Sequence, residues 1–147
     1  MKNQKNKLLV FGVIAFIGII SAVSVFAGQY GFYLSIPRAQ GFAETTDSMG
    51  NGYITGKQST YANVYLEGFR GIEAVTFYAG ALSSDGSSSF GKNGAYIYRA
   101  DFESGEQTDV SVPYGYKYAN GQKMGLRARN HNWSLNTGDV SGVVDYH

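Results

Sequence analysis

Residues 61 to 79 read Tyr-Ala-Asn-Val-Tyr-Leu-Glu-Gly-Phe-Arg-Gly-Ile-Glu-Ala-Val-Thr-Phe-Tyr-Ala. From Ala62 to Leu66, every second side chain is apolar, and the residues between them are asparagine and tyrosine. The segment Gly68 to Gly71 interrupts this pattern, which resumes at Val75. Alternation with a period of two is typical of a half-buried β-strand. The stretch therefore predicts two strands separated by a glycine-rich break.

The same period of two extends over most of the chain after residue 27. It recurs from Phe32 to Ile36, from Ala95 to Phe102 and from Met124 to Arg129, with Arg127 and Arg129 facing outward. Turn signals such as Asn120-Gly121 separate the segments about every 8 to 12 residues, and no segment shows a helical period. We predict an all-β fold, an antiparallel two-sheet β-sandwich of about seven or eight short strands.

The amino-acid composition supports this fold class. The chain contains 20 glycines, 12 tyrosines and only two prolines, and it has no cysteine. Aromatic residues favour strands and glycine favours the turns between them. Without disulfides, the domain must be held together by burial and backbone pairing.

The first 27 residues have the character of a secretory signal peptide. Lys2, Lys5 and Lys7 precede an apolar run that begins at Leu8 and ends at a small residue, Ala27. We expect cleavage there, which divides the chain into a leader, 1–27, and one secreted domain, 28–147. The alternative is an uncleaved membrane anchor, because about 20 apolar residues can span a bilayer. Either reading places the domain outside the cytoplasm, and only the anchor would make the membrane a partner.

Removal of the leader changes the sign of the net charge. The whole chain has 12 basic and 11 acidic residues, and three of the basic residues lie in the leader. The remaining domain has 9 basic residues against 11 acidic ones. This balance argues against nucleic acid as a partner and against electrostatic adhesion to an anionic membrane.

The sequence offers little support for catalysis. The only histidines are His131 and His147, no cysteine can act as a nucleophile, and no G-x-S-x-G motif is present. The ligand spacings of zinc and calcium sites are also missing. We therefore expect a protein that is not an enzyme and needs no metal or cofactor. A small hydrolase that uses two carboxylates stays open, with Glu67 or Glu73 as its acid.

The most distinctive local motif is Pro113-Tyr114-Gly115-Tyr116-Lys117-Tyr118. In an extended strand, Tyr114, Tyr116 and Tyr118 would share one face, where their rings could stack on sugars or on a partner protein. Trp133, the only tryptophan, lies in a predicted turn and could join them. The alternative is that these rings cover the edge of the core. The sequence thus predicts an aromatic binding face made of Tyr114, Tyr116, Tyr118 and Trp133.

Two segments near the ends of the domain resemble a known family. Residues 30–41 read Tyr-Gly-Phe-Tyr-Leu-Ser-Ile-Pro-Arg-Ala-Gln-Gly, residues 124–133 read Met-Gly-Leu-Arg-Ala-Arg-Asn-His-Asn-Trp, and Val-Ser-Gly follows at 140–142. They resemble the opening and the close of a family of small secreted Firmicutes proteins of unknown function. Such proteins are sometimes associated with lactococcin-type bacteriocin systems. The resemblance implies export from a Gram-positive cell, a β fold and action at the bacterial envelope, and it brings no catalytic residues.

These observations lead to one main hypothesis and three alternatives. We expect a secreted, non-enzymatic β-sandwich that binds a glycan or protein at the cell envelope or another extracellular surface. It could instead be a bacteriocin-like effector, or an extracellular assembly protein that pairs through an exposed sheet edge. The carboxylate-dependent hydrolase is the last alternative.

Overall fold

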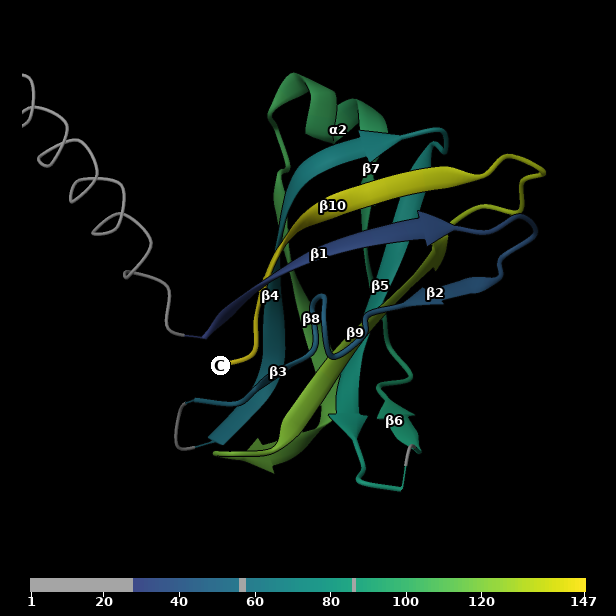
Figure 1. The fold of residues 1–147 in the computed structure, drawn as a ribbon. Helices are drawn as coiled ribbons and strands as arrows, with labels where there is room; N and C mark the ends of the chain where they lie inside the picture. The colour runs from purple at the N-terminus through teal and green to yellow at the C-terminus, as the bar shows by residue number, and fades with distance from the viewer. Residues whose placement is uncertain (1–27, 56–57, 86) are drawn as a thin grey trace, which may run out of the picture.

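The computed structural model describes residues 28–55, 58–85 and 87–147 (Figure 1). The predicted leader, residues 1–27, lies outside the described residues. Within the described residues, no helix is long and apolar enough to cross a membrane. The described chain forms two antiparallel sheets packed face to face, which confirms the predicted all-β sandwich.

The first sheet has four strands, and β10 and β4 lie in its interior. Its order is β1 (Gln29–Ile36), β10 (Gly138–Asp145), β4 (Gln58–Arg70) and β8 (Asp109–Ala119). The last strand of the domain therefore pairs with the first one along its whole length, from Gln29 opposite Asp145 to Ile36 opposite Gly138. This pairing holds the two ends of the domain together.

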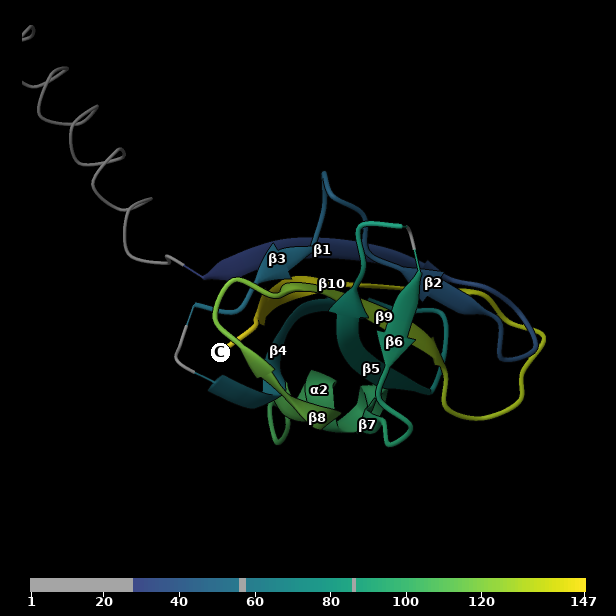
Figure 2. The same ribbon diagram turned by 90° about the horizontal axis from the view of Figure 1, so that it is seen from below.

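The second sheet has six strands, several of them very short. Its main path is β2 (Phe42–Glu44), β9 (Lys123–Asn130), β5 (Ala74–Leu82) and β6 (Ser88–Phe90), with β3 (Gly52–Tyr53) paired to β9 and β7 (Ala95–Tyr98) paired to β5. Figure 2 shows that the four-stranded sheet curls, so that β8 at its edge comes close to β7 of the other sheet.

The core lies between the two sheets. Alternate side chains of β1, β4 and β10 face those of β5 and β9. Phe32 from the first sheet and Phe77 from the second meet edge to face, with their ring centroids 6.1 Å apart. On β9, Met124, Leu126 and Ala128 are fully buried, as their spacing predicts. Period-two burial is therefore the main cause of the fold.

The structure has more strands than the sequence predicts. The described residues form ten strands, and the additional ones are β2 and β6. They lie in the stretches 40–50 and 83–94, which the sequence predicts to be loops because they show no strand-like alternation. Each of the two strands has three residues, which is too short to show a period. The predicted break at Gly68 to Gly71 is also shifted, because β4 continues to Arg70 and the chain turns at Gly71, where φ is 83°.

One predicted strand segment is a helix. The alternation from Ala95 to Phe102 predicts a single strand, but β7 ends at Tyr98 and the helix α2 (Arg99–Ser104) follows. The helix ends at Gly105, which adopts the left-handed conformation and donates its N–H to the Phe102 carbonyl. The Phe102 ring packs against Phe69 of β4, 6.1 Å between centroids. This packing, which a local pattern does not encode, favours the helix.

Candidate functional site

The outer face of the four-stranded sheet carries a row of exposed tyrosines, here called the tyrosine face. Its members are Tyr33 on β1, Tyr61 and Tyr65 on β4, and Tyr116 on β8, with exposed fractions of 52%, 42%, 39% and 66%. Three of these rings are exposed because they alternate with core residues along their strands. From Tyr61 to Tyr65 the strand advances about 13 Å, so the face is longer than a single small ligand.

A β-bulge shapes the centre of this face. Ser141 of β10 pairs with Gly68 of β4, and the next residue, Gly142, pairs with Leu66, so that Glu67 has no partner of its own. A bulge turns consecutive side chains toward the same side and often lies next to a functional site. Glycine at position 68 also keeps the floor open, since an added Cβ would come within 2.6 Å of the Ser141 hydroxyl.

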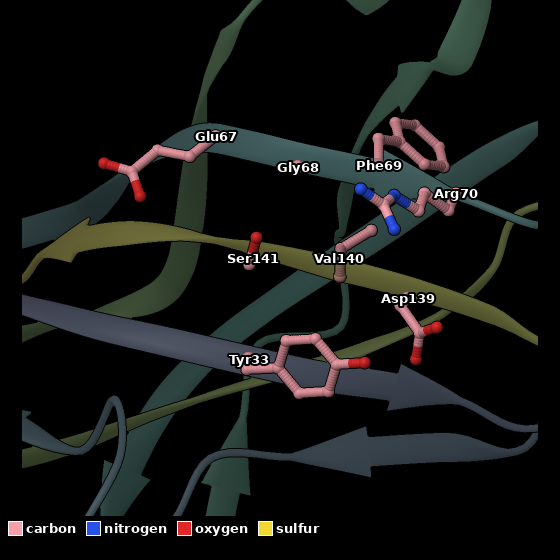
Figure 3. Close-up of a pocket in the computed structure, with 8 residues that line it drawn as sticks. All are labelled: Tyr33, Glu67, Gly68, Phe69, Arg70, Asp139, Val140 and Ser141. Carbon is pink, nitrogen blue, oxygen red and sulfur yellow. The ribbon is translucent and has the colours of Figure 1, made fainter.

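The bulge and the tyrosine of β1 enclose a shallow pocket of about 290 Å³ (Figure 3). The residues that line it come from β1, β4 and β10: Tyr33, Glu67, Gly68, Phe69, Arg70, Asp139, Val140 and Ser141. Figure 3 shows the Tyr33 ring lying toward Asp139, whereas the Glu67 carboxylate lies at the opposite end of the pocket. The Ser35 hydroxyl donates a hydrogen bond to Asp139 at 2.8 Å, which holds that carboxylate at the rim.

Two further hollows extend the same face. One, of about 590 Å³, shares Glu67 with the first pocket and is lined also by Gln29, Gly31, Tyr65 and Val143. The other, of about 670 Å³, lies against β8 and is lined by Thr60, Tyr61, Ser111, Pro113, Gly115, Tyr116 and Lys117. Each of the three hollows therefore has at least one member of the tyrosine face in its wall.

The polar groups of this face include three carboxylates as well as the cations Arg70 and Lys117. Glu67 and Asp139 line the first pocket, and Asp109 lies on β8 opposite Tyr65. Among the described residues, neither Glu67 nor Arg70 takes part in an ion pair. The face thus combines exposed rings with carboxylates, the Arg70 guanidinium and the Lys117 ammonium group.

The structure separates the three tyrosines that the sequence places on one face. Tyr114 is fully buried, Tyr116 is exposed, and Tyr118 is half-buried against the core. The cause is the conformation of β8, in which Gly115 has a φ of 79°. Burial raises the pKa of the Tyr114 hydroxyl well above its usual value. Of the three residues, only Tyr116 belongs to the tyrosine face.

The β8 irregularity is visible in its pairing with β4. From Ser59 to Tyr61, β4 advances two residues, whereas β8 changes from Tyr118 to Pro113. The additional β8 residues break the period of two on which the predicted row depended. The three rings still pack together. The centroid of the Tyr118 ring lies 5.6 Å from that of Tyr114 and 6.4 Å from that of Tyr116.

Trp133 does not join the tyrosines. It is 68% exposed in the loop after β9, as the sequence predicts, but Tyr116 and Tyr118 lie near the turn that precedes β9. The eight residues of β9 span about 26 Å between the two places. Trp133 is therefore at the other end of the sandwich.

Among the described residues, carboxylates share pockets but form no metal-binding cluster. The described part of the chain contains no group of three histidine, cysteine, aspartate or glutamate side chains that could hold a metal ion. Carboxylates share two pockets: Glu67 and Asp139 line the first one, and Glu73, Asp101 and Glu103 line another, of about 390 Å³, beside α2. His131, in the loop after β9, is half-buried, and its ring stacks on the Tyr96 ring with 4.3 Å between the ring centroids.

Sequence reasoning missed three members of the tyrosine face, although the signal was present. Tyr33, Tyr61 and Tyr65 each stand next to buried residues in strands with a clear period of two. The period of two predicts that these side chains point outward. It does not predict that they share one surface, which results from the pairing of β1 with β10 and of β10 with β4. Only the sheet order reveals the site.

Comparisons with known proteins provide little further information. No protein-family model matches the chain. No curated protein matches it either. Among solved structures, the chain is similar to one titled "Crystal structure of PirA", with a TM-score of 0.43 and 10% sequence identity over 80% of this chain and 94% of that one. A similarity at this level carries no argument about function.

Proposed function

We propose that this protein is a secreted, non-enzymatic β-sandwich whose tyrosine face binds a neutral glycan of the bacterial cell envelope. The observation that supports the proposal is the position of four exposed tyrosines beside three hollows on one sheet face. Large exposed patches with apolar character on a small domain are commonly interaction sites.

The chemistry of the face suits a sugar chain. A tyrosine ring offers an apolar surface for the C–H face of a pyranose, and its hydroxyl remains available for hydrogen bonding. Carboxylates such as Glu67 and Asp139 accept hydrogen bonds from sugar hydroxyls, and Arg70 donates them. Because carboxylates outnumber cations in the first pocket, an anionic polymer is disfavoured there.

We expect Tyr33→Ala to weaken retention of the mature protein on purified cell-wall glycan by about tenfold or more, because a central aromatic contact commonly contributes over 1 kcal/mol. Tyr53→Ala is a matched control, since Tyr53 is 50% exposed but lies on β3 of the other sheet. Sedimentation of the protein with insoluble peptidoglycan measures the effect. Equal loss in both variants, or no loss in either, would contradict the proposal.

The extracellular location is tested separately. We expect the culture supernatant of the producing cell to contain a species that begins at Gly28, because a small residue at Ala27 ends the apolar leader. Intact-mass measurement of the supernatant and membrane fractions gives the answer. A full-length species in the membrane fraction would instead indicate an anchored protein.

The shared pocket of Glu67 and Asp139 also favours one alternative, a hydrolase that uses two carboxylates. In Figure 3 the two carboxylates lie at opposite ends of the pocket, so a substrate would have to lie between them. Incubation of the mature protein with cell-wall glycan, followed by a reducing-end assay, decides between the two functions. Turnover that Glu67→Gln or Asp139→Asn abolishes would replace binding by hydrolysis.

A further inference from the structure

The outer face of the six-stranded sheet carries two arginines among aromatic rings, here called the arginine–aromatic face. Its residues are Phe42 on β2, Arg127 and Arg129 on β9, Tyr78 on β5 and Phe90 on β6. The Arg127 guanidinium carbon lies 4.2 Å from the centroid of the Phe42 ring, 4.6 Å from Phe90 and 5.3 Å from Tyr78. The Arg129 carbon lies 5.5 Å from Phe42 and 5.4 Å from Tyr78.

Neither arginine has a counter-ion. All 11 acidic residues of the chain lie in the described segments, and none comes within 4.0 Å of either guanidinium. Glu44 is opposite Arg127 in the β2–β9 pairing, yet no ion pair forms between them. The Nε atoms of both arginines are buried and have no hydrogen-bond partner among the described residues. Two partly desolvated cations therefore lie side by side without neutralisation.

The face continues toward β7 through a histidine and two tyrosines. His131 accepts or donates a hydrogen bond at 2.8 Å between its Nδ1 and the Thr76 hydroxyl. The His131 ring stacks on the Tyr96 ring, and its centroid lies 6.0 Å from the centroid of the Tyr98 ring. Thr76 pairs with Arg129 on one side and with Tyr96 on the other. Exposed rings of Tyr96 and Tyr98 thus lie two strands from the arginines on the same surface.

This arrangement suits an oxyanion attached to a ring. A guanidinium stacked on an aromatic ring keeps the N–H groups at its edge free, and that edge matches the two oxygens of a carboxylate or phosphate. An anion would also relieve the unfavourable proximity of two uncompensated cations. The neighbouring rings of Phe42 and Tyr96 offer surfaces against which a sugar can stack.

We propose that the arginine–aromatic face binds an anionic saccharide, with Arg127 and Arg129 pairing to its carboxylate or phosphate. This site goes beyond the proposed function, because it lies on the other sheet and takes an anionic ligand, whereas the tyrosine face takes a neutral one. The two outer faces of the sandwich then recognise different chemistry: rings with carboxylates on one side, and rings with arginines on the other.

The test compares three probes, glucuronate, glucose 6-phosphate and glucose, by chemical-shift titration of the mature protein. We expect shifts at Arg127 and Arg129 with one or both anions and none with glucose, and the stronger anion identifies the source of the charge. Arg127→Gln should weaken anion binding by about tenfold or more, as expected for the loss of a charge-assisted hydrogen bond. Arg38→Gln, at an exposed position of the β1–β2 loop, should leave it unchanged.

Two further variants separate a loss of anion binding from a loss of folding. Arg127→Lys preserves the charge and the side-chain stem but loses the planar edge, so it should bind the anion more weakly while remaining folded. Glu44→Gln removes the nearest competing carboxylate on β2 and should strengthen binding. Equal shifts with glucose and with the anions would overturn the proposal, as would a dimer of the mature protein that Arg127→Gln dissociates. Tyr33→Ala should not affect anion binding. The glycan proposal and the anion proposal can therefore be refuted independently.

Discussion

Gly142→Ala should remove most of the stability of the domain. A Cβ at this position would overlap the carbonyl oxygen of Tyr65 on the neighbouring strand, and it would lie 3.0 Å from the Cα of Leu66. Both neighbours are backbone atoms, so no side-chain rotation relieves the overlap. We expect the free energy of unfolding to fall by about 3 kcal/mol or more, which is a large part of the 5–15 kcal/mol typical of a domain.

The position of β10 explains why the strand cannot move away. It is hydrogen-bonded to β1 on one side and to β4 on the other, and Gly142 lies where the pairing with β4 shifts register. Gly31→Ala is a matched control, because Gly31 lies on the adjacent strand and its added Cβ would have no neighbour closer than 4.0 Å. Urea denaturation followed by circular dichroism compares the two, and equal midpoints would contradict the argument.

The same overlap connects stability to the candidate site. The backbone of β4 comes close to Gly142 because Glu67 is bulged out, and this bulge forms one side of the first pocket. A variant that forces the strands apart should therefore lose glycan retention as well as stability. Gly68→Ala should act only on the pocket, since its Cβ meets the end of the Ser141 side chain rather than backbone.

The sequence predicts the fold class well because burial in this protein follows a period of two. Phe32 and Leu34 on β1, and Leu126 and Ala128 on β9, are buried as that period requires, and Arg127 faces outward between them. The failures occur where local pattern and tertiary context disagree. Phe102 continues the alternation of β7 but packs on Phe69 from a helix. Strands of three residues carry too little pattern to be recognised.

The candidate site was predictable only in part, for a different reason. A period of two tells which side chains face outward, and this information was available for Tyr33 and Tyr65. It does not tell which strands are neighbours, because β1 and β4 meet only through β10, the last strand of the domain. The prediction that Tyr114, Tyr116 and Tyr118 share one face was wrong because Gly115 adopts a positive φ. This conformation changes the side of the strand to which the following residues point.

The two fully buried tyrosines should respond in opposite directions to loss of the hydroxyl group. Tyr146 donates a hydrogen bond to the carbonyl of Gly50 at 2.7 Å. The hydroxyl of Tyr114 is buried near the Ser59 hydroxyl, but among the described residues it makes no hydrogen bond of 3.5 Å or shorter. We expect Tyr146→Phe to cost about 1–3 kcal/mol, because it leaves a buried carbonyl unpaired, and Tyr114→Phe to stabilise the domain by about 1 kcal/mol. Urea denaturation at pH 7 tests both signs.

Above pH 10 the same two hydroxyls should make the domain unstable. Burial raises the pKa of Tyr114 and of Tyr146 above the usual tyrosine value of about 10, which both groups regain in the unfolded chain. The neutral forms therefore stabilise the fold fully below pH 10, and this contribution is lost as the pH rises toward the folded-state pKa values. The free energy of unfolding should fall by about 1.4 kcal/mol per pH unit for each tyrosine, about 2.7 kcal/mol for both. Tyr114→Phe should halve this slope in urea titrations between pH 10 and 12, and a slope that the variant does not change would show that Tyr114 ionises without unfolding.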